Sequence, residues 1–161
     1  VYNEFLRRRP DLVGVMAKPF CWTKHSEMSS EEKPYYESPI FNFLDGKLCI
    51  AFGPKHIEKG HLLPAAPKIT AEQTEGIRLM EQICEDQHFE MSLERGDIQF
   101  ANNAVILHTR EGFEDWPELE RRRQLWRLWL VQPEIRQANP YILQWRNGVH
   151  PKGTKLKVTL T

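Results

Sequence analysis

The sequence predicts a mainly β fold, an antiparallel sheet or barrel with helical decoration. Three observations support this fold class. Residues 40–52 have a hairpin pattern, short alternating runs return after residue 88, and one amphipathic helix near residues 70–85 would cover a sheet. We find no internal repeat and no low-complexity segment, so residues 1–161 are expected to form a single domain.

Composition excludes several classes of protein. The 161 residues are 40% apolar and 27% charged, which is typical of a globular domain rather than a disordered or membrane chain. The 22 basic and 22 acidic side chains give a formal net charge of zero. This balance removes the long-range attraction that a nucleic-acid binder needs, so no nucleic-acid partner is expected. The two basic runs, Arg7–Arg9 and Arg121–Arg123, are interpreted as solvated surface.

Cysteine usage and the chain ends suggest a reducing, cytoplasmic location. Cys21, Cys49 and Cys84 are odd in number and widely spaced, which argues against a disulfide framework or a structural zinc site. No apolar stretch approaches the ~20 residues of a transmembrane helix, so no membrane partner is expected. The chain begins at Val1 with neither Met nor a signal-peptide pattern, and we expect it to be part of a longer polypeptide.

Local patterns define the elements of the first half. Residues 1–18 read as helical, and Pro10 either opens a second short helix or kinks the first. Residues 18–39 are broken by prolines and are expected to be loop, with a short strand at residues 20–23. Strands at residues 40–44 and 47–52 flank Asp45-Gly46, a dipeptide favoured in type I′ turns.

A loop rich in Gly and Pro is expected from the hairpin through Pro67. Thr70 and Gln73 then form a capping box, and the apolar side chains behind it recur at helical spacing through about residue 85.

The second half contains shorter strands and one open alternative. Residues 89–93, 98–101 and 104–108 read as strands, with a turn at residues 95–97. Residues 117–130 fit an amphipathic helix slightly better than a strand beginning at Arg122. Residues 138–161 carry turn signals and then an alternating run, and they are interpreted as a terminal extension.

One ordered set of motifs resembles a known family. It runs from Gly96-Asp97 through Asn103 and the Leu107-His108 pair, and it continues from Phe113-Glu114-Asp115 to an arginine-rich segment at residues 122–130. This set resembles the taurine/2,4-D dioxygenase family of Fe(II)/2-oxoglutarate enzymes. The helix that contains Arg9-Pro10-Asp11-Leu12, the Pro39–Gly46 hairpin and the helix that begins at Thr70 look like the same family in the same order, so the resemblance covers about residues 1–135. It implies the C-terminal part of a double-stranded β-helix, or jelly roll, of the clavaminate synthase-like type, and it favours the strand reading of residues 122–130.

The resemblance also implies roles for four residues. His108 matches the family's distal histidine, a catalytic iron ligand, and imidazole nitrogen suits Fe(II). Arg123 matches the arginine that pairs with the distal carboxylate of the co-substrate 2-oxoglutarate, a task for a bidentate guanidinium. Arg127 matches a position that binds the acid group of anionic substrates, and Asn103 is expected to steady the His108 strand as an outer-shell residue.

The family's other two iron ligands form a His-x-Asp or His-x-Glu pair upstream, and no matching pair is found in the expected place. The chain has three His-x-Glu triplets, beginning at His25, His56 and His88, but none lies where relatives have ligands. The implied partners are therefore a small-molecule substrate and a missing N-terminal portion of the same protein. This chain alone is expected to be inactive. A homo-oligomer is compatible with the sequence, which leaves the oligomeric state open.

Three other functions remain open on the sequence, and the weakest of them, a nucleic-acid binder that uses the basic runs, is disfavoured by the zero net charge. A non-catalytic or truncated relative would keep the fold for binding or assembly. A helical interaction domain would instead use residues 117–130 as an amphipathic, partner-binding helix.

Overall fold

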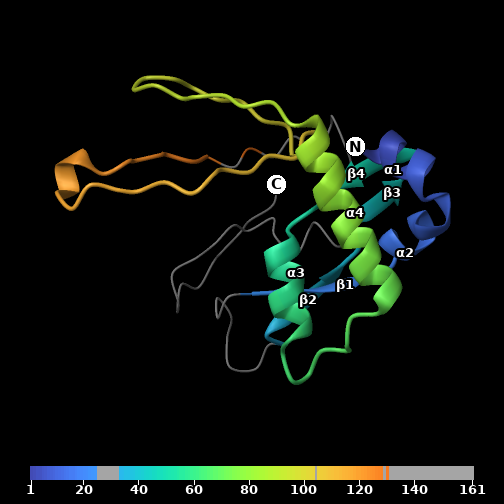
Figure 1. Ribbon diagram of the computed structural model, residues 1–161. Helices are drawn as coiled ribbons and strands as arrows, with labels where there is room; N and C mark the ends of the chain where they lie inside the picture. The colour runs from blue at the N-terminus through green and yellow to red at the C-terminus, as the bar shows by residue number, and fades with distance from the viewer. Residues whose placement is uncertain (25–32, 104, 129, 131–161) are drawn as a thin grey trace, which may run out of the picture.

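The computed structural model describes residues 1–24, 33–103, 105–128 and 130 (Figure 1). Two two-stranded antiparallel sheets lie among several helices in the part before residue 88. In chain order the elements are α1 (Tyr2–Arg8), η1 (Pro10–Leu12), α2 (Val13–Met16), β1 (Phe20–Thr23), β2 (Tyr35–Ser38), β3 (Phe41–Leu44), β4 (Lys47–Ile50), α3 (Pro54–His61), α4 (Ala71–Gln87) and η2 (Leu119–Arg121).

The N-terminal helices follow the predicted pattern. Pro10 opens the 3-10 turn η1, where its missing N–H costs no helical hydrogen bond, and α2 follows directly. The predicted strand at residues 20–23 is confirmed as β1.

The strand β2 was not predicted, because its sequence lies between two prolines. It pairs with β1 in antiparallel register, with Trp22 opposite Tyr36. These two rings stack with centroids 5.9 Å apart, and the Trp22 indole N–H donates to the Ser38 carbonyl at 2.8 Å. The pairing depends on contacts across the chain rather than on local propensity.

The hairpin β3–β4 is confirmed, with Phe41 opposite Ile50 and Leu44 opposite Lys47. Asp45 and Gly46 have φ values of 50° and 70°. Two consecutive residues at positive φ are what a type I′ turn requires, and this turn fits the twist of the two strands.

Helix α3 replaces the loop predicted after the hairpin. It packs on β1 at Gly60, where an added Cβ would lie 2.6 Å from the carbonyl carbon of Cys21 and 2.9 Å from the backbone nitrogen of Thr23. Next to it, His61 Nε2 accepts a hydrogen bond from the Cys21 N–H at 3.1 Å, and His61 Nδ1 lies 2.8 Å from the Pro67 carbonyl. Backbone contact with β1 therefore stabilises a helix that local periodicity does not show.

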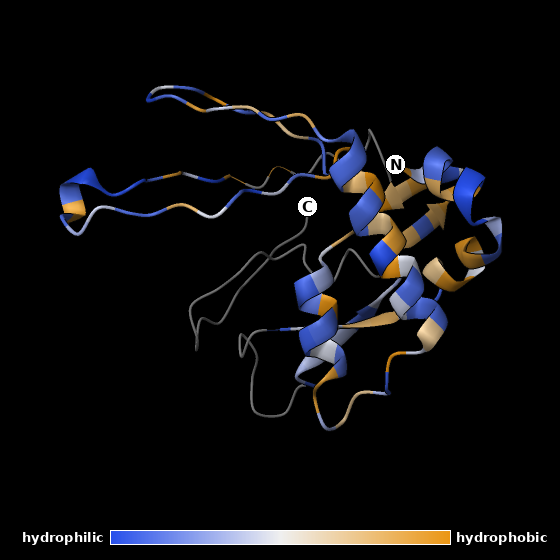
Figure 2. Cartoon of the chain, in the orientation of Figure 1, coloured by the Kyte–Doolittle hydropathy of each residue, from blue (hydrophilic) through white to orange (hydrophobic). Residues whose placement is uncertain are grey.

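Helix α4 begins as predicted. The Thr70 hydroxyl accepts from the Gln73 N–H at 3.1 Å, and the Gln73 side chain accepts from the Thr70 N–H at 3.0 Å. The helix presents one apolar face to the core (Figure 2). At Gly76 it lies so close to Met16 in α2 that an added Cβ would collide with the thioether. The core cluster joins both sheets to the helices. Its fully buried side chains are Phe5, Met16, Phe20, Ile40, Phe41, Ile57, Met80 and Ile83.

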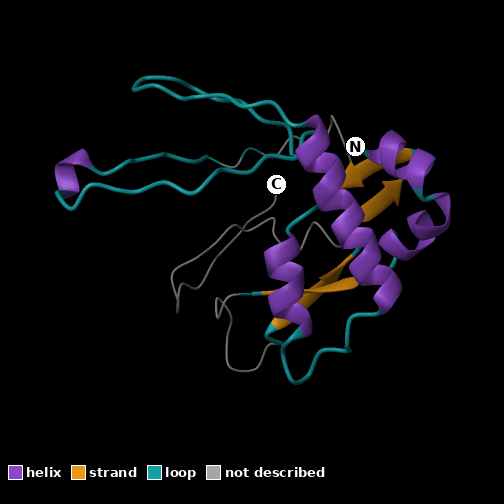
Figure 3. Cartoon of the chain, in the orientation of Figure 1, coloured by secondary structure: helices purple, strands orange, loops and turns teal. Residues whose placement is uncertain are grey.

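We call the part of the chain before residue 88 the body. The described residues of two segments, residues 88–106 (the first arm) and residues 108–128 (the second arm), extend away from it (Figures 1 and 3). Between them, Leu107 packs against the core cluster. The strands predicted at residues 89–93 and 98–101 are wrong, as is the described part of the strand predicted at residues 104–108, because the described residues there make no sheet. Alternation specifies which side chains share a face, but a strand also needs a partner for its backbone groups.

The apolar side chains of the arms remain exposed: Phe89, Ile98, Phe100, Val105, Leu119, Trp126 and Leu128 are each 70% exposed or more. Neither reading of residues 117–130 is found in the described part: η2 is the one helical turn there, and the strand expected from Arg122 is not formed. The proposed terminal extension at residues 138–161 lies outside the described residues.

No helix among the described residues is long and apolar enough to cross a membrane.

Candidate functional site

His108 lies at the start of the second arm, directly after Leu107, whose side chain is packed on the body. The His108 side chain is exposed. The sequence predicted that Asn103 would lead directly into a strand ending at His108. Instead the Asn102 carbonyl accepts from the N–H groups of Val105 and Ile106, both at 2.9 Å, which makes a turn. Asn103 is exposed in this turn, and no hydrogen bond among the described residues links it to His108.

Arg123 lies on the returning side of the second arm and is held there by two contacts. Its backbone N–H donates to Asp115 Oδ1 at 2.9 Å, and the same oxygen accepts from the Trp116 N–H at 3.1 Å. Its guanidinium carbon lies 5.3 Å from the centre of the Phe113 ring. The guanidinium carbon of Arg110 lies 4.7 Å from the same ring centre. Both distances are within the range of cation–π attraction.

The other arginines of this run stabilise the end of the arm. Arg121 lies over the Trp116 ring, with its guanidinium carbon 3.3 Å from the ring centre. Arg122 donates to the carbonyl oxygens of Trp116 and Pro117, at 3.2 and 3.1 Å. These contacts close the arm around η2. The residues Arg121–Arg123 therefore stabilise the arm, and the interpretation of this run as merely solvated surface is wrong.

Arg127 lies four residues beyond Arg123 on an extended, exposed stretch. In the described part of the chain it makes no hydrogen bond, ion pair or ring contact. The structure therefore places Arg123 and Arg127 on the same arm as His108, while it does not bring Asn103 into contact with any of them.

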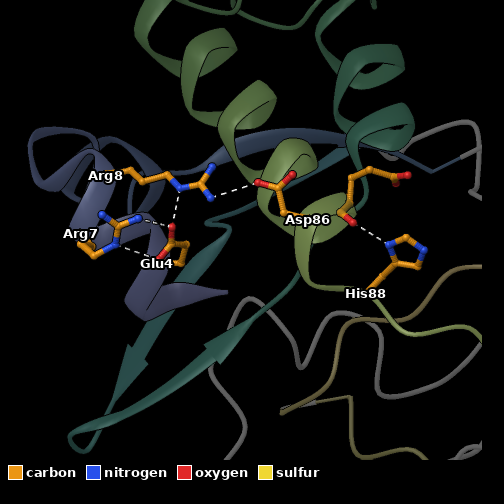
Figure 4. Close-up of polar contacts among 6 residues, drawn as sticks. Glu4, Arg7, Arg8, Asp86 and His88 are labelled. Atoms are coloured by element: carbon orange, nitrogen blue, oxygen red, sulfur yellow. Dashed lines mark hydrogen bonds and ion pairs between the residues drawn. The ribbon is translucent and has the colours of Figure 1, made fainter.

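The other basic run, Arg7–Arg9, joins the N-terminal helix to α4 (Figure 4). Arg7 and Arg8 both donate to the Glu4 carboxylate, and Arg8 also donates to Asp86 in α4 at 3.0 Å. These hydrogen bonds, aided by the two positive charges, lower the pKa of Glu4 from 4.5 to about 2.

Arg9 continues this network, because it pairs with Asp11 at 2.6 Å and with Glu75 in α4. Both basic runs therefore have intramolecular partners, which agrees with a structural rather than a ligand-binding role for residues 7–9.

No group of three or more histidine, cysteine or carboxylate side chains in the described ranges is placed to hold a metal ion. Of the three His-x-Glu triplets, the first lies outside the described residues and the second lies in α3. In the third, His88 Nδ1 lies 2.6 Å from the Glu85 carbonyl, and Nε2 lies 3.7 Å from the Glu90 carboxylate. The hydrogen bond to Glu85 raises the pKa of His88. His88 is thus bonded to the end of its own helix (Figure 4).

Comparison with known proteins identifies the family. The family described as "Taurine catabolism dioxygenase TauD, TfdA family" matches residues 1–129. The chain therefore belongs to the TauD/TfdA dioxygenases, which generally depend on Fe(II) and 2-oxoglutarate. Membership implies a jelly-roll fold, whereas the described residues show short antiparallel strands and helices and no jelly roll.

Two relatives support this assignment. The chain is 30% identical over 141 residues to a taurine hydroxylase-like protein of Stachybotrys chartarum, an alignment that covers 84% of this chain and 35% of that protein. It is 29% identical over 139 residues to the FR-33289 synthase of Streptomyces rubellomurinus, covering 81% of this chain and 40% of the synthase. The chain thus spans less than half the length of both relatives.

Iron fits the described residues only in part. His108 offers one exposed imidazole at a position that matches the family pattern, and a facial site needs a second histidine and a carboxylate beside it. The described residues do not bring such a pair to His108.

Sequence reasoning did not find how Arg123 is held. Phe113 and Asp115 were part of the family pattern, but no role was assigned to them, and Arg110 was not singled out. The signal that could have found them is their composition, because an aromatic ring and a carboxylate placed between two arginines can contact both sides of a hairpin.

Proposed function

We propose that the complete protein is an Fe(II)/2-oxoglutarate-dependent dioxygenase that hydroxylates a small, anionic organic substrate and decarboxylates 2-oxoglutarate to succinate. Family membership supports the general class of reaction. For this chain, the proposal rests on the contacts of Arg123. Its backbone and ring contacts fix it in place, while its guanidinium has no carboxylate partner among the described residues.

The proposed roles follow from the chemistry of each side chain. Arg123 presents a planar fork of N–H donors that matches the distal carboxylate of 2-oxoglutarate. His108 supplies one imidazole ligand to the iron, which activates oxygen when it is bound. Arg127 binds an acid group of the substrate from the same arm. Asn103 steadies the backbone before His108 from its turn.

The name of one relative extends the proposal without fixing a substrate. A taurine hydroxylase-like protein suggests a sulfonate or a similar small acid, which Arg127 is suited to bind. We therefore propose an anionic substrate as a class.

Succinate production by the full-length protein tests the proposed activity. We expect succinate to form only when Fe(II), 2-oxoglutarate and a suitable small acid are all present. His108→Ala is expected to abolish it, because it removes a proposed iron ligand. The matched control is His88→Ala, which removes an exposed histidine that is bonded to its own helix end.

Failure to form succinate with a broad panel of small acids would contradict the proposed activity. It would favour instead a non-catalytic relative that keeps the fold for binding. The sequence upstream of Val1 separates these two readings, because a His-x-Asp or His-x-Glu pair there supports the enzyme.

A further inference from the structure

The second arm contains a set of contacts whose centre is Arg123. Asp115 and Arg123 are eight residues apart, and one carboxylate oxygen of Asp115 links them through the Arg123 N–H. The same oxygen accepts from the Trp116 N–H, so it also fixes the backbone on its own side of the arm. A charged acceptor makes stronger hydrogen bonds than a neutral one. Asp115 thus sets the register between the outgoing and returning halves of the arm.

Phe113 makes the second link, through side chains rather than backbone. Its ring is shared by the guanidinium groups of Arg110 and Arg123, at 4.7 and 5.3 Å from the ring centre. Arg110 lies two residues after His108, so the ring connects the His108 end of the arm with Arg123. Contact with a ring face restrains a long side chain but uses none of its N–H donors.

The three neighbouring arginines differ in what their guanidinium groups do. Arg122 donates hydrogen bonds to two carbonyl oxygens. Arg121 lies on the Trp116 ring at the end of the arm. The guanidinium of Arg123 donates no hydrogen bond within the described residues. It is restrained in position and has its donors available, which is the state that suits a side chain that binds a carboxylate.

We propose that Phe113 and Asp115 are positioning residues that place the Arg123 guanidinium for the distal carboxylate of 2-oxoglutarate. The proposal rests on the proposed function for the identity of that carboxylate. Asp115 fixes the backbone of Arg123, and Phe113 fixes its side chain relative to the segment that carries His108. Neither residue touches the co-substrate itself.

Steady-state kinetics of the full-length enzyme test the positioning. Phe113→Leu and Asp115→Ala are expected to raise the KM for 2-oxoglutarate roughly threefold to thirtyfold, from the range of cation–π and charged hydrogen-bond effects. The kcat at saturating 2-oxoglutarate and the apparent Fe(II) requirement should change by less than about twofold. General damage to the fold would not give this split, because a smaller fraction of folded enzyme lowers the apparent kcat and leaves the KM of the remaining enzyme unchanged.

Conservative and control variants sharpen this test. Asp115→Asn keeps the oxygen that accepts from Arg123, and Phe113→Tyr keeps the ring, so both should restore most of the affinity. Glu114→Ala is the matched control, because Glu114 is an exposed carboxylate beside Asp115 with no contact to Arg123. Unchanged KM values in Phe113→Leu and Asp115→Ala, or an equal rise in Glu114→Ala, would overturn the proposal.

Arginine-specific dicarbonyl labelling with mass spectrometry separates this proposal from the proposed function. We expect Phe113→Leu to raise the labelling rate of Arg123 at least about threefold and to leave Arg127 unchanged. If Arg123 labelling does not respond to the Phe113 and Asp115 variants, the positioning is wrong. If it responds but 2-oxoglutarate neither protects Arg123 nor shows an altered KM, the positioning stands without this ligand, and the proposed co-substrate role is the part that fails.

Discussion

The body, residues 1–87, and the two arms, residues 88–106 and 108–128, differ in how their apolar side chains are used. In the body, Phe5 and Phe41 are buried and meet edge to face, with ring centres 5.1 Å apart. In the arms, Phe100 and Trp126 are 83% and 93% exposed. The body is thus held by burial, and the described part of the arms is held by arginine contacts and turns. The residues proposed to bind ligands are all in the arms.

The buried core and the proposed ligand-binding residues therefore lie in different parts of the chain. The family's sequence pattern spans both, since the match covers residues 1–129. Burial in the body decides whether the chain folds, whereas the ligand-binding roles proposed above belong to residues of the arms. Substitutions should therefore divide into those that affect unfolding and those that affect ligand affinity.

The largest expected effect on stability comes from a matched pair of phenylalanines. Phe41→Ala should lower the free energy of unfolding by about 3–5 kcal/mol, because it leaves a cavity beneath Tyr2 and Phe5. Phe100→Ala in the first arm should change it by less than about 0.5 kcal/mol. Denaturant unfolding of the chain measures both. Comparable losses would show that the arm is packed as tightly as the body.

A pair of glycines tests how the body is assembled. Gly60→Ala should destabilise the chain by about 1–3 kcal/mol, because its Cβ would overlap the backbone of Cys21 and Thr23. Gly14→Ala is the control, since nothing lies within 4 Å of its added Cβ, and it should be neutral or stabilising by up to about 1 kcal/mol. Equal midpoints in urea for the two variants would argue that α3 does not pack on β1 through its backbone.

The smallest expected effect concerns pH. The pKa of Glu4 is about 2 in the folded chain against an ordinary value of 4.5, because Arg7 and Arg8 donate to its carboxylate. The folded chain therefore holds this proton less tightly than the unfolded chain. The stabilisation is complete above about pH 4.5 and is lost as the pH falls toward 2.

Glu4→Gln should flatten the dependence of the unfolding free energy on pH within that window, as measured by denaturant unfolding at several pH values. Glu58→Gln removes an exposed carboxylate that makes no ion pair among the described residues, and it should leave the slope unchanged. An unaltered slope in Glu4→Gln would contradict the hydrogen bonds that Arg7 and Arg8 donate to the Glu4 carboxylate in the folded chain.

Local chemistry allowed parts of the body to be predicted from sequence. The Thr70 capping box and the Asp45-Gly46 turn were read correctly, because each depends on backbone groups within a few residues. Helix α3 and strand β2 were missed for the opposite reason. Ile57 and Gly60 are the only buried residues of α3, and its place is decided by β1, forty residues away in sequence.

The site was only partly predictable. Family resemblance pointed to His108 and Arg123, and the family itself is confirmed, while the roles of these residues stay predictions. Periodicity implied strands in the arms because their side chains alternate, yet pairing requires a partner that the pattern does not contain. The contacts of Phe113 and Asp115 with Arg123 depend on how the arm folds back, which spacing alone does not give.

The affinity of the full-length protein for 2-oxoglutarate tests the central claim most directly, when Arg123→Ala is compared with Arg121→Ala. The two arginines share one run and both lie on aromatic rings, but only Arg123 has its guanidinium proposed for the co-substrate. We predict that Arg123→Ala raises the Kd roughly tenfold to a hundredfold, the loss of a charged hydrogen-bonded pair, and that Arg121→Ala changes it by less than about threefold. A Kd that is unchanged in Arg123→Ala, or raised equally by both substitutions, would contradict the claim.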